Sequence, residues 1–352
     1  MQRNKPGKFK FIYWFAYYNL DSPSVRYRAK FPLEFLKTNY GIGFFFVTPG
    51  YHPKNILLFL NAYFSALLFR HPNSLIVVQR INSNFIYANL LKFLVMVRKS
   101  DTRYDLDDAD YLDHPPKTIY YFIKNCSTVS VGSLELQQNL SPFNKSILVN
   151  TSPTPDLDIC KKAKNELLTV GWIGCFGGGH KESLIELFFP ALKDLPFKIK
   201  LVLLGVVLTS EYGFMTDYFR SFENVALEMP QNIDWRDEHN IQQRISEFDV
   251  GIATLLNDEL HRSKSAFKLK QYLNNGVPVL SSNIPENNFF IEEGRNGFLC
   301  TTTDDFRKRI IELHEMKNID FMKLSATART AKARFNLANY GDQLLSGLSN
   351  EE

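Results

Sequence analysis

Short apolar runs alternate with longer amphipathic stretches along almost the whole chain of 352 residues. The apolar runs are continuous, which is typical of strands buried on both faces of a parallel sheet, and the stretches between them have helical spacing. Before residue 150 the pattern predicts strands at "FKFIYWFAY", "IGFFFVTP", "SLIVVQ", "TRYDLD", "STVSV" and "SILVN". Helices are expected between them, beginning near Ser24, Pro53, Asn84, Thr118 and Ser133.

The segment "TSPTPDLD" (Thr151–Asp158) interrupts this alternation with two prolines and several turn formers, so it predicts a linker. After it the pattern predicts strands at "LLTVGWIG", "FKIKLVLLG", "NVALEM", "DVGIA", "VPVLSS" and "GFLC". The helices expected in this part cover about 181–195, 211–222, 234–247, 265–274 and a stretch from Pro285, and three more close the chain, the last at 337–348.

This order predicts two doubly wound α/β domains, 1–152 and 153–335, followed by a helix within 336–352 that packs back toward the first domain. Ligands in such sheets bind beyond the carboxyl ends of the strands. The cleft between two facing domains is therefore the expected site.

Composition adds a charge difference between the two halves. The chain is 45% hydrophobic and 22% charged, which indicates a globular protein. Residues 1–150 hold 18 Lys and Arg against 9 Asp and Glu, whereas the remainder holds 23 against 28. The basic half indicates an anionic partner or, equally well, a solvated surface. It lacks basic motifs interleaved with aromatics, so nucleic acid is the least favoured partner.

Cysteine usage and hydropathy bear on location. The four cysteines are scattered without a Cys-x-x-Cys pair, which argues against a zinc site or a disulfide framework and fits a reducing cytosol. The N-terminal apolar run is a poor signal peptide. "ILLFLNAYFSALLF" (Ile56–Phe69) falls short of the ~20 residues that span a bilayer. We expect a cytoplasmic protein, and leave open peripheral attachment to the inner face of the membrane.

The stretch "GWIGCFGGGHKES" (Gly171–Ser183) predicts a phosphate-binding loop that fits neither familiar nucleotide motif. No three glycines have dinucleotide spacing, and His180 separates Gly179 from Lys181 where a P-loop needs direct succession. Glycines nevertheless allow close approach to a ligand, and a helix start with a lysine attracts anions. The alternative is a tight turn that binds nothing.

A second stretch, "FDVGIATLLNDELHRSKSAFKLKQYLNNGVPVLSS", carries Lys264 and Lys268 four residues apart. On one face of a helix these two charges repel each other. Their placement makes sense if an anion lies between them, and the alternative is a solvated lysine face.

Here the chain resembles glycosyltransferase family 4, the glycogen-synthase-like retaining enzymes with the GT-B fold. The resemblance rests on the order and spacing of "DVGIA", "FKLKQYL", "GVPVLSS" and "PENNFFIEEGRNGFL", and it reaches back through the glycine loop. It implies two Rossmann-like domains facing a central cleft. A nucleotide sugar, UDP- or GDP-linked and with no further cofactor, would bind the C-terminal domain.

The chain departs from the family pattern at three positions. Ser263 and Gln271 stand where the family has two glutamates, and Cys175 stands where its phosphate loop has an arginine. The resemblance implies that Lys181 and Lys268 act catalytically by stabilising the departing diphosphate. Donor-binding residues are expected to be Gly174, Cys175, Phe176, Gly177, Lys264, Phe267 and Gln271. A catalytically inactive glycan- or nucleotide-binding relative is the alternative, as is a GT-B nucleotide-sugar epimerase.

The acceptor is assigned to the N-terminal domain. Ser24 is expected to cap a helix, with Arg26 and Arg28 two residues apart, one facing the cleft and the other solvent. Arg80 ends a strand, and Asp105, Asp107 and Asp108 follow another. Asp105 and Asp107 are predicted catalytic, and the acceptor-binding residues are predicted to be Ser24, Arg26, Arg28, Arg80 and Asp108.

No metal is expected at these aspartates. The cluster lacks EF-hand spacing, and the family generally needs no metal at this step. The single histidines His180 and His261 are interpreted as incidental. The predicted function is retaining transfer of a sugar to a glycan or lipid-linked acceptor, in cell-envelope polysaccharide synthesis by analogy.

Overall fold

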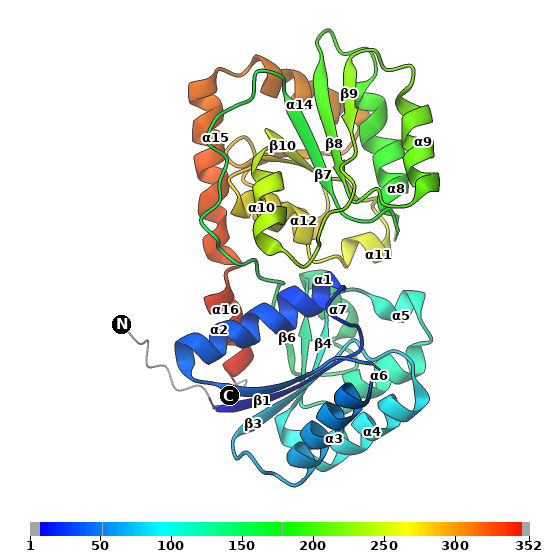
Figure 1. The fold of residues 1–352 in the computed structure, drawn as a ribbon, viewed down its shortest axis with the longest axis vertical. Helices are drawn as coiled ribbons and strands as arrows, with labels where there is room; N and C mark the ends of the chain where they lie inside the picture. The colour runs from blue at the N-terminus through cyan, green and yellow to red at the C-terminus, as the bar shows by residue number, and fades with distance from the viewer. Residues whose placement is uncertain (1–7, 51, 178, 347–352) are drawn as a thin grey trace. The chain divides into compact units, whose positions relative to one another are not determined.

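The computed structural model describes residues 8–50, 52–177 and 179–346, which form two compact units (Figure 1). Unit 1 comprises Met1–Pro155, Ser263–Ser265 and Phe335–Glu352, and unit 2 comprises Asp156–Arg262 and Ala266–Arg334. Gly178 of the predicted phosphate loop and the end of the predicted 337–348 helix lie outside the described residues. Each unit is a parallel sheet with helices on both faces.

The sheet of unit 1 has six strands in the order β2-β1-β3-β4-β5-β6, and every pairing is parallel. Its central strands are buried at every residue, which explains their unbroken apolar runs. The strands are β1 (Phe11–Ala16), β2 (Gly43–Val47), β3 (Ser74–Gln79), β4 (Thr102–Leu106), β5 (Thr128–Val131) and β6 (Ile147–Val149).

Helices cover both faces of this sheet. Figure 1 shows α3, α4 and α6 on one side and α2 and α16 on the other, and α16 packs against α2. The helices are α1 (Pro23–Val25), α2 (Phe31–Tyr40), α3 (Pro53–Leu67), α4 (Phe85–Val97), α5 (Asp110–Asp113), α6 (Pro116–Asn125), α7 (Leu134–Leu140) and α16 (Leu337–Leu345), with a short 3-10 turn η2 (Lys99–Asp101) before β4.

Two predictions about the first helix are wrong. Ser22, not Ser24, occupies the N-cap position of α1, and no side chain caps it. A π-helix, η1 (Arg26–Lys30), joins α1 to α2 and changes the angular step between side chains. As a result neither arginine faces solvent: Arg26 is 3% exposed and Arg28 is fully buried.

The sheet of unit 2 is also six-stranded and has the order β12-β11-β10-β7-β8-β9. A large apolar core of valine, leucine, isoleucine and phenylalanine side chains packs on it, with Trp172 among them. The strands are β7 (Thr169–Ile173), β8 (Ile199–Leu204), β9 (Val225–Glu228), β10 (Val250–Ala253), β11 (Val279–Ser282) and β12 (Gly297–Cys300).

The helices of unit 2 differ from expectation in several places, and α10 (Glu238–Ser246) begins four residues later than expected. The helix expected at 181–195 is a run of three short segments, α8 (His180–Ser183), the π-helix η3 (Leu184–Phe188) and the 3-10 turn η4 (Phe189–Leu192). The helix expected from residue 265 begins two residues later. The other helical segments are α9 (Thr209–Phe219), α10 (Glu238–Ser246), α11 (Glu259–Arg262), α12 (Phe267–Asn274), α13 (Pro285–Phe290), α14 (Thr303–Glu315), α15 (Asn318–Thr330) and η5 (Ala331–Arg334).

The start of α12 corrects the lysine prediction. Lys264 precedes α12, and Lys268 lies in its first turn, so the two do not share a helical face. Ala266 between them has a left-handed backbone, with φ of 51°, which turns the chain sharply before the helix.

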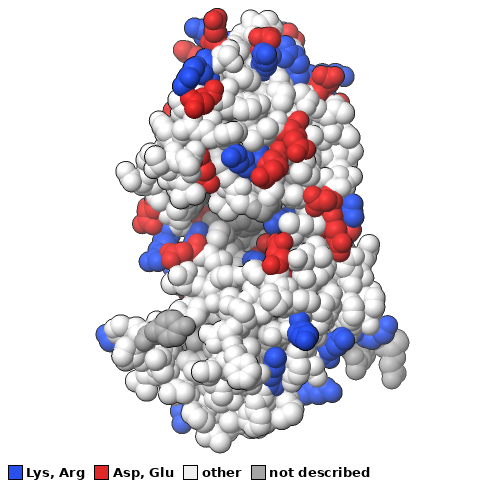
Figure 2. All heavy atoms as spheres, turned by 90° about the vertical axis from the view of Figure 1, so that its right-hand side faces the viewer, with Lys and Arg blue, Asp and Glu red and all other residues white. Residues whose placement is uncertain are grey.

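Charge is distributed differently over the two units. Figure 2 shows acidic and basic side chains mixed over unit 2, whereas basic side chains on a largely uncharged surface predominate over the part of unit 1 in view. The face in view thus agrees with the sequence count, which gave the first 150 residues an excess of Lys and Arg.

Candidate functional site

The glycine loop of unit 2 lies where an open α/β sheet binds its ligands. It follows β7, and β7 lies between β10 and β8, where the strand order reverses direction. Segments that leave the carboxyl ends of β7 and β10 diverge at this point and leave room for a ligand. The loop after β10 runs through Asn257 into α11, so the sequence stretches singled out above meet at one sheet edge.

At two positions of the loop, neighbouring side chains come so close to the backbone that only glycine fits. Gly174 has φ of 149°, and a Cβ on it would lie 2.5 Å from Cε of Lys268. Gly179 has φ of 76°, and a Cβ there would lie 2.3 Å from Nε2 of His261. Both conformations disfavour other residues. The glycines therefore bring the backbone of the loop against a lysine and a histidine.

Lys268 reaches the loop and contacts His180. Its Nζ lies 2.8 Å from Nε2 of His180 and 5.8 Å from the centre of the Trp172 ring. A protonated amine has only N–H donors, so this contact requires an unprotonated Nε2 on the histidine. Protonation of His180 would place two cations in contact, an arrangement that a bound anion would relieve.

His261 is fixed by Asp258. The histidine is 3% exposed, its Nδ1 lies 2.6 Å from Oδ2 of Asp258, and its backbone N–H donates to Oδ1 at 2.9 Å. Partial burial alone would raise the pKa of Asp258, but the bonds from His261 outweigh it and hold that pKa below its ordinary value. The carboxylate thus orients the imidazole, with Nε2 directed at Gly179.

These two histidines are the residues that sequence reasoning missed. Their ring centres lie 6.5 Å apart, and both lie against the glycine loop. The one sequence feature that could have identified His261 is the spacing Asp258-x-x-His261, which allows a local hydrogen bond between carboxylate and imidazole. Nothing in the sequence shows that this pair faces a loop eighty residues earlier.

The remaining donor-site residues occupy varied positions. Nζ of Lys181 lies 3.9 Å from the centre of the Phe214 ring of α9, where a cation–π contact holds it. Cys175 and Gly177 are exposed, whereas Phe176 is buried against Trp172 in the core. Phe267 is partly exposed and Gln271 is 8% exposed, one turn apart on α12.

In unit 1, Arg28 and Asp105 form a buried ion pair. Arg28 Nε and Nη2 donate to the two carboxylate oxygens at 2.9 and 2.6 Å. Its other N–H groups donate to the backbone of Asn150 and to the hydroxyls of Ser130 and Ser152. These bonds use all five donors of the guanidinium. In this arrangement the pair fastens β4 to the π-helix, and its predicted contact with substrate stays a prediction.

Arg26 also bonds within its own unit. Its Nη1 donates to the carbonyls of Leu20 and Asp21 at 2.8 Å each. It thereby fixes the loop after β1, next to Ser24, whose hydroxyl lies 3.4 Å from Nη1 of Arg80.

Arg80 is the centre of the acidic cluster. It binds Asp110 through two bonds, of 2.8 and 2.5 Å, and its Nη1 lies 3.1 Å from Asp107 and 3.7 Å from Asp108. Its guanidinium also lies 5.3 Å from the centre of the Tyr18 ring. Arg80 itself has a left-handed backbone, with φ of 53°, as found at strained functional positions. One cation is thus shared by three carboxylates.

Asp107 is the most perturbed carboxyl group of this cluster. Burial raises its pKa to about 6, although the charge of Arg80 opposes the change. Burial likewise raises the pKa of Asp110. A carboxyl group with a pKa close to neutrality can exchange a proton under physiological conditions, which suits acid–base chemistry.

Lys264 belongs to the short segment Ser263–Ser265 that groups with unit 1. Its Nζ lies 3.7 Å from Oδ1 of Asp108, and the Ser133 hydroxyl donates to the carbonyl of Ser263 at 2.8 Å. The structure therefore places this lysine beside the aspartate cluster, while Lys268 stays beside the glycine loop.

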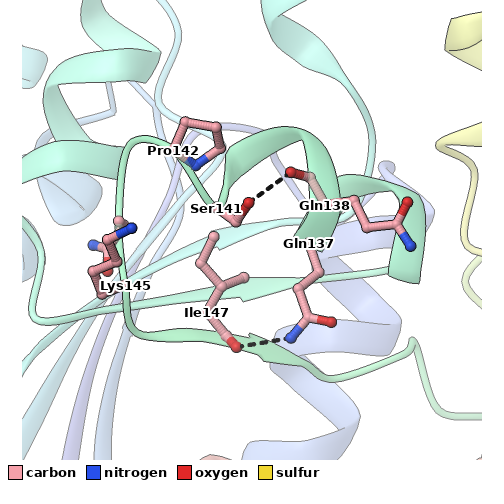
Figure 3. A pocket seen from close by; sticks show the side chains of 7 residues that line it. Gln137, Gln138, Ser141, Pro142, Lys145 and Ile147 are labelled. Atoms are coloured by element: carbon pink, nitrogen blue, oxygen red, sulfur yellow. Dashed lines mark hydrogen bonds between the residues drawn. The ribbon is translucent and has the colours of Figure 1, made fainter.

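A separate hollow of about 500 Å³ lies beside α7 and β6 (Figure 3). Gln137 Nε2 donates to the carbonyl of Ile147, and the Ser141 hydroxyl donates to the carbonyl of Gln138, so these lining groups bond within the protein. The hollow lies at the amino end of β6, away from the carboxyl ends where α/β sheets bind ligands. It is not part of the candidate site.

Among residues 8–50, 52–177 and 179–346, no group of three or more His, Cys, Asp or Glu side chains is arranged to hold a metal ion.

No protein-family model matches the chain, and no curated protein sequence matches it either. Solved structures do match. Anabaena HepE in complex with UDP and glucose aligns over 95% of this chain and 98% of its own, with TM-score 0.63 and 14% identity. Sucrose-phosphate synthase from Thermosynechococcus elongatus aligns over 95% and 97%, with TM-score 0.67 and 11% identity.

The lipopolysaccharide outer core galactosyltransferase WaaB, in its apo form, aligns over 95% of this chain and 98% of its own, with TM-score 0.63 and 13% identity. At these identities the likeness concerns the fold. It confirms the fold class predicted from the sequence: two parallel six-stranded sheets with flanking helices, as in two-domain GT-B glycosyltransferase structures.

Proposed function

We propose that this protein is a glycosyltransferase that takes a sugar from a nucleotide-sugar donor, with retention of configuration at the transferred carbon. The observation that carries the proposal is the meeting of Lys268, His180 and His261 at the glycine loop, at the strand-order reversal of unit 2. The similar fold of HepE, solved with UDP and glucose, supports a nucleotide-sugar donor.

In this proposal the donor diphosphate lies against the loop Gly174–Gly179. Lys268 supplies positive charge there, and the His180 imidazole lies in contact with its Nζ. Both residues would stabilise the negative charge that develops on the departing diphosphate in the transition state. Such stabilisation is the largest contribution that a site of this kind makes to lowering the activation barrier. Gln271 is assigned to the ribose, and Lys181 would assist from the Phe214 face. No protein nucleophile is required, because the departing phosphate can itself accept the proton of the acceptor hydroxyl.

Unit 1 would bind the acceptor, a glycan or a lipid-linked sugar. The Arg80 cluster offers carboxylates at the carboxyl ends of β3 and β4, and such groups bind sugar hydroxyls well. Asp107 and Asp108 are the residues assigned to acceptor hydroxyls, whereas Arg28 and Asp105 would hold β4 in place behind them. Envelope polysaccharide synthesis and a cytoplasmic, metal-independent reaction remain part of this proposal.

The first test is a thermal-shift screen of the full chain with UDP, GDP, ADP, CMP and their sugars. A ligand present at 100 times its Kd adds about 2.7 kcal/mol of stability, which is readily seen. We expect one diphosphate nucleotide to stabilise the protein, and Lys268→Ala to weaken its Kd by roughly 10- to 100-fold, since a charge-assisted hydrogen bond contributes about 1.5–3 kcal/mol. Lys323→Ala on α15, an exposed lysine of the same unit, is the matched control.

Three outcomes decide the proposal. Stabilisation by no nucleotide would overturn the donor site. Binding without hydrolysis or transfer of the sugar would favour a non-catalytic nucleotide-binding protein instead. Product sugar with inverted configuration, read from the anomeric proton coupling, would refute retention alone.

A further inference from the structure

Two neighbouring helices of unit 1 expose an unusual number of large apolar side chains. Of the 23 exposed large hydrophobic side chains among the described residues, twelve fall between positions 56 and 97. Exposed fractions reach 83% at Phe85, 72% at Ile86 and 69% at Leu57. The twelve are Ile56, Leu57, Leu58, Leu60, Phe64, Leu68, Phe69, Phe85, Ile86, Phe93, Met96 and Val97. We call them the α3–α4 surface.

The exposed apolar side chains of α3 are not needed to fill the core of unit 1. α3 already packs its opposite side into unit 1 through Ala62, Tyr63 and Ala66, all nearly buried. Leu57, Phe64 and Leu68 recur on its outer side at helical spacing, so α3 is apolar on both sides. A contiguous exposed apolar patch on a folded unit marks an interaction surface.

The two helices form one continuous face. α3 packs beside α4 on the same side of the sheet, as Figure 1 shows. The outer side of α3 carries a shallow hollow of about 630 Å³, bordered by Leu57, Leu60, Phe64 and the stem of Lys54. Apolar side chains that lie side by side in this way can enter one common environment.

The chain segment that carries the α3–α4 surface is basic, and the first acidic residue after it is Asp101 at the end of η2, 3.3 Å from Nζ of Lys8. Residues 35–100 contain no Asp or Glu and seven Lys and Arg. Lys54 is exposed at the start of α3, Arg70 follows its end, and Lys99 follows α4. Figure 2 shows basic side chains on a largely uncharged surface of this unit. Apolar helices flanked by cations are complementary to a bilayer with anionic head groups.

The helices are the right length to lie on a bilayer and too short to cross it. α3 has 15 residues and α4 has 13, against the ~20 needed for a span. Among the described residues, no helix combines the length and the apolar character of a membrane span. A typical protein–protein interface has a polar rim, whereas this surface of aliphatic, Phe and Met side chains is flanked along the chain by the exposed cations Lys54, Arg70 and Lys99.

We propose that the α3–α4 surface docks unit 1 on an anionic lipid bilayer, with both helices lying in the plane of the interface. The proposal goes beyond the donor chemistry of unit 2 and needs none of its residues. Because vesicle binding can be measured without nucleotide, the failure of one proposal is separable from the failure of the other.

The test is co-sedimentation of the full chain with vesicles of phosphatidylcholine, alone or mixed with phosphatidylglycerol. We expect binding to the mixed vesicles, weakened by salt. The double variant Phe85→Ser/Ile86→Ser should lower the partition coefficient by roughly 100-fold, about tenfold for each side chain withdrawn from the bilayer. Lys54→Gln should lower it by about fivefold at low salt and less at high salt. Ile319→Ser on α15, 64% exposed in unit 2, is the matched control and should change nothing.

Thermal unfolding of each variant checks that it is folded. Absence of binding to the mixed vesicles by the unmodified chain overturns the proposal. So does equal binding to both vesicle types, or an equal loss in Ile319→Ser. Sedimentation velocity tests whether a second copy of the chain binds this surface instead. If the unmodified chain is a dimer that does not bind vesicles, and Phe85→Ser/Ile86→Ser converts it to a monomer, the surface is a dimer interface.

Discussion

Replacing Asp107 by asparagine is expected to stabilise unit 1 at neutral pH. Burial raises the pKa of this carboxyl from an ordinary 3.8 to about 6, so the folded protein disfavours the carboxylate. A difference of about two pKa units corresponds to roughly 3 kcal/mol between the two protonation states. The amide of the Asp107→Asn variant keeps the shape of the side chain and removes the charge. Arg80 retains its two bonds to Asp110, so no cation is left alone.

The sign of the pH dependence follows from linkage. Between about pH 4 and pH 6 the folded state holds a proton on Asp107 that the unfolded state has lost, so the contribution of Asp107 to stability falls as pH rises through this window. The advantage of Asp107→Asn should be absent below about pH 4, grow across the window and level off above about pH 6. The upper bound of this stabilisation is about 3 kcal/mol. In a domain of this size each kcal/mol raises Tm by roughly 2–4 °C.

The assay is urea unfolding of the full chain at four pH values from about pH 4 to about pH 7, which bracket the window, following the transition of unit 1. Asp113→Asn is the control, because that carboxyl lies exposed on α5, and its substitution should change stability little at any of these pH values. A stability difference for Asp107→Asn that is constant over the whole pH range would refute the reasoning. Destabilisation at neutral pH would mean that attraction to Arg80 exceeds the cost of burial. If Asp107 also serves the acceptor, the stabilised variant should transfer sugar more slowly.

Three further outcomes are expected. Arg28→Met should destabilise the protein by about 3–5 kcal/mol in urea unfolding, because it leaves Asp105 charged and buried without its partner, whereas a loss under about 1 kcal/mol would contradict that view. Gly174→Ala should weaken nucleotide binding in calorimetry, since its backbone conformation disfavours a side chain and Cβ would meet Lys268; Gly213→Ala on α9, with nothing within 4 Å of the added carbon, should bind as before. Asp258→Asn should lower nucleotide affinity if it lets the imidazole of His261 rotate, and unchanged affinity would remove this pair from the donor site.

The architecture was predictable because it is encoded locally. Runs such as "SLIVVQ" and "TRYDLD" are buried residue by residue, and only a strand covered on both faces needs such continuity. The loop Gly174–Gly179 was predictable as a loop for a similar reason, because a glycine cluster between an apolar run and a helical stretch marks a tight turn. The helix boundaries that were wrong include those at the π-helix and before α12, where the backbone departs from α-helical geometry and no residue marks the change.

The partners of the charged side chains were not predictable. Arg28 pairs with Asp105 across 77 residues, and His180 contacts Lys268 across 88. The sequence offers many equivalent choices among its Asp, Lys and His residues, and only the packed sheets bring one pair within bonding distance. The raised pKa of Asp107 is likewise a property of its surroundings, since burial sets it and burial belongs to the tertiary structure.

The sequence by itself determined the two doubly wound units, the glycine-lined loop and the excess of basic residues in the first half, because each is written in local pattern or composition. Only the tertiary structure decided which side of α3 enters the core and which remains on the surface. The physical reason is that a helix apolar all round carries no signal for its own orientation. Its direction is fixed by the sheet on which it packs, and that packing is what leaves Leu57 and Phe64 on the outer face.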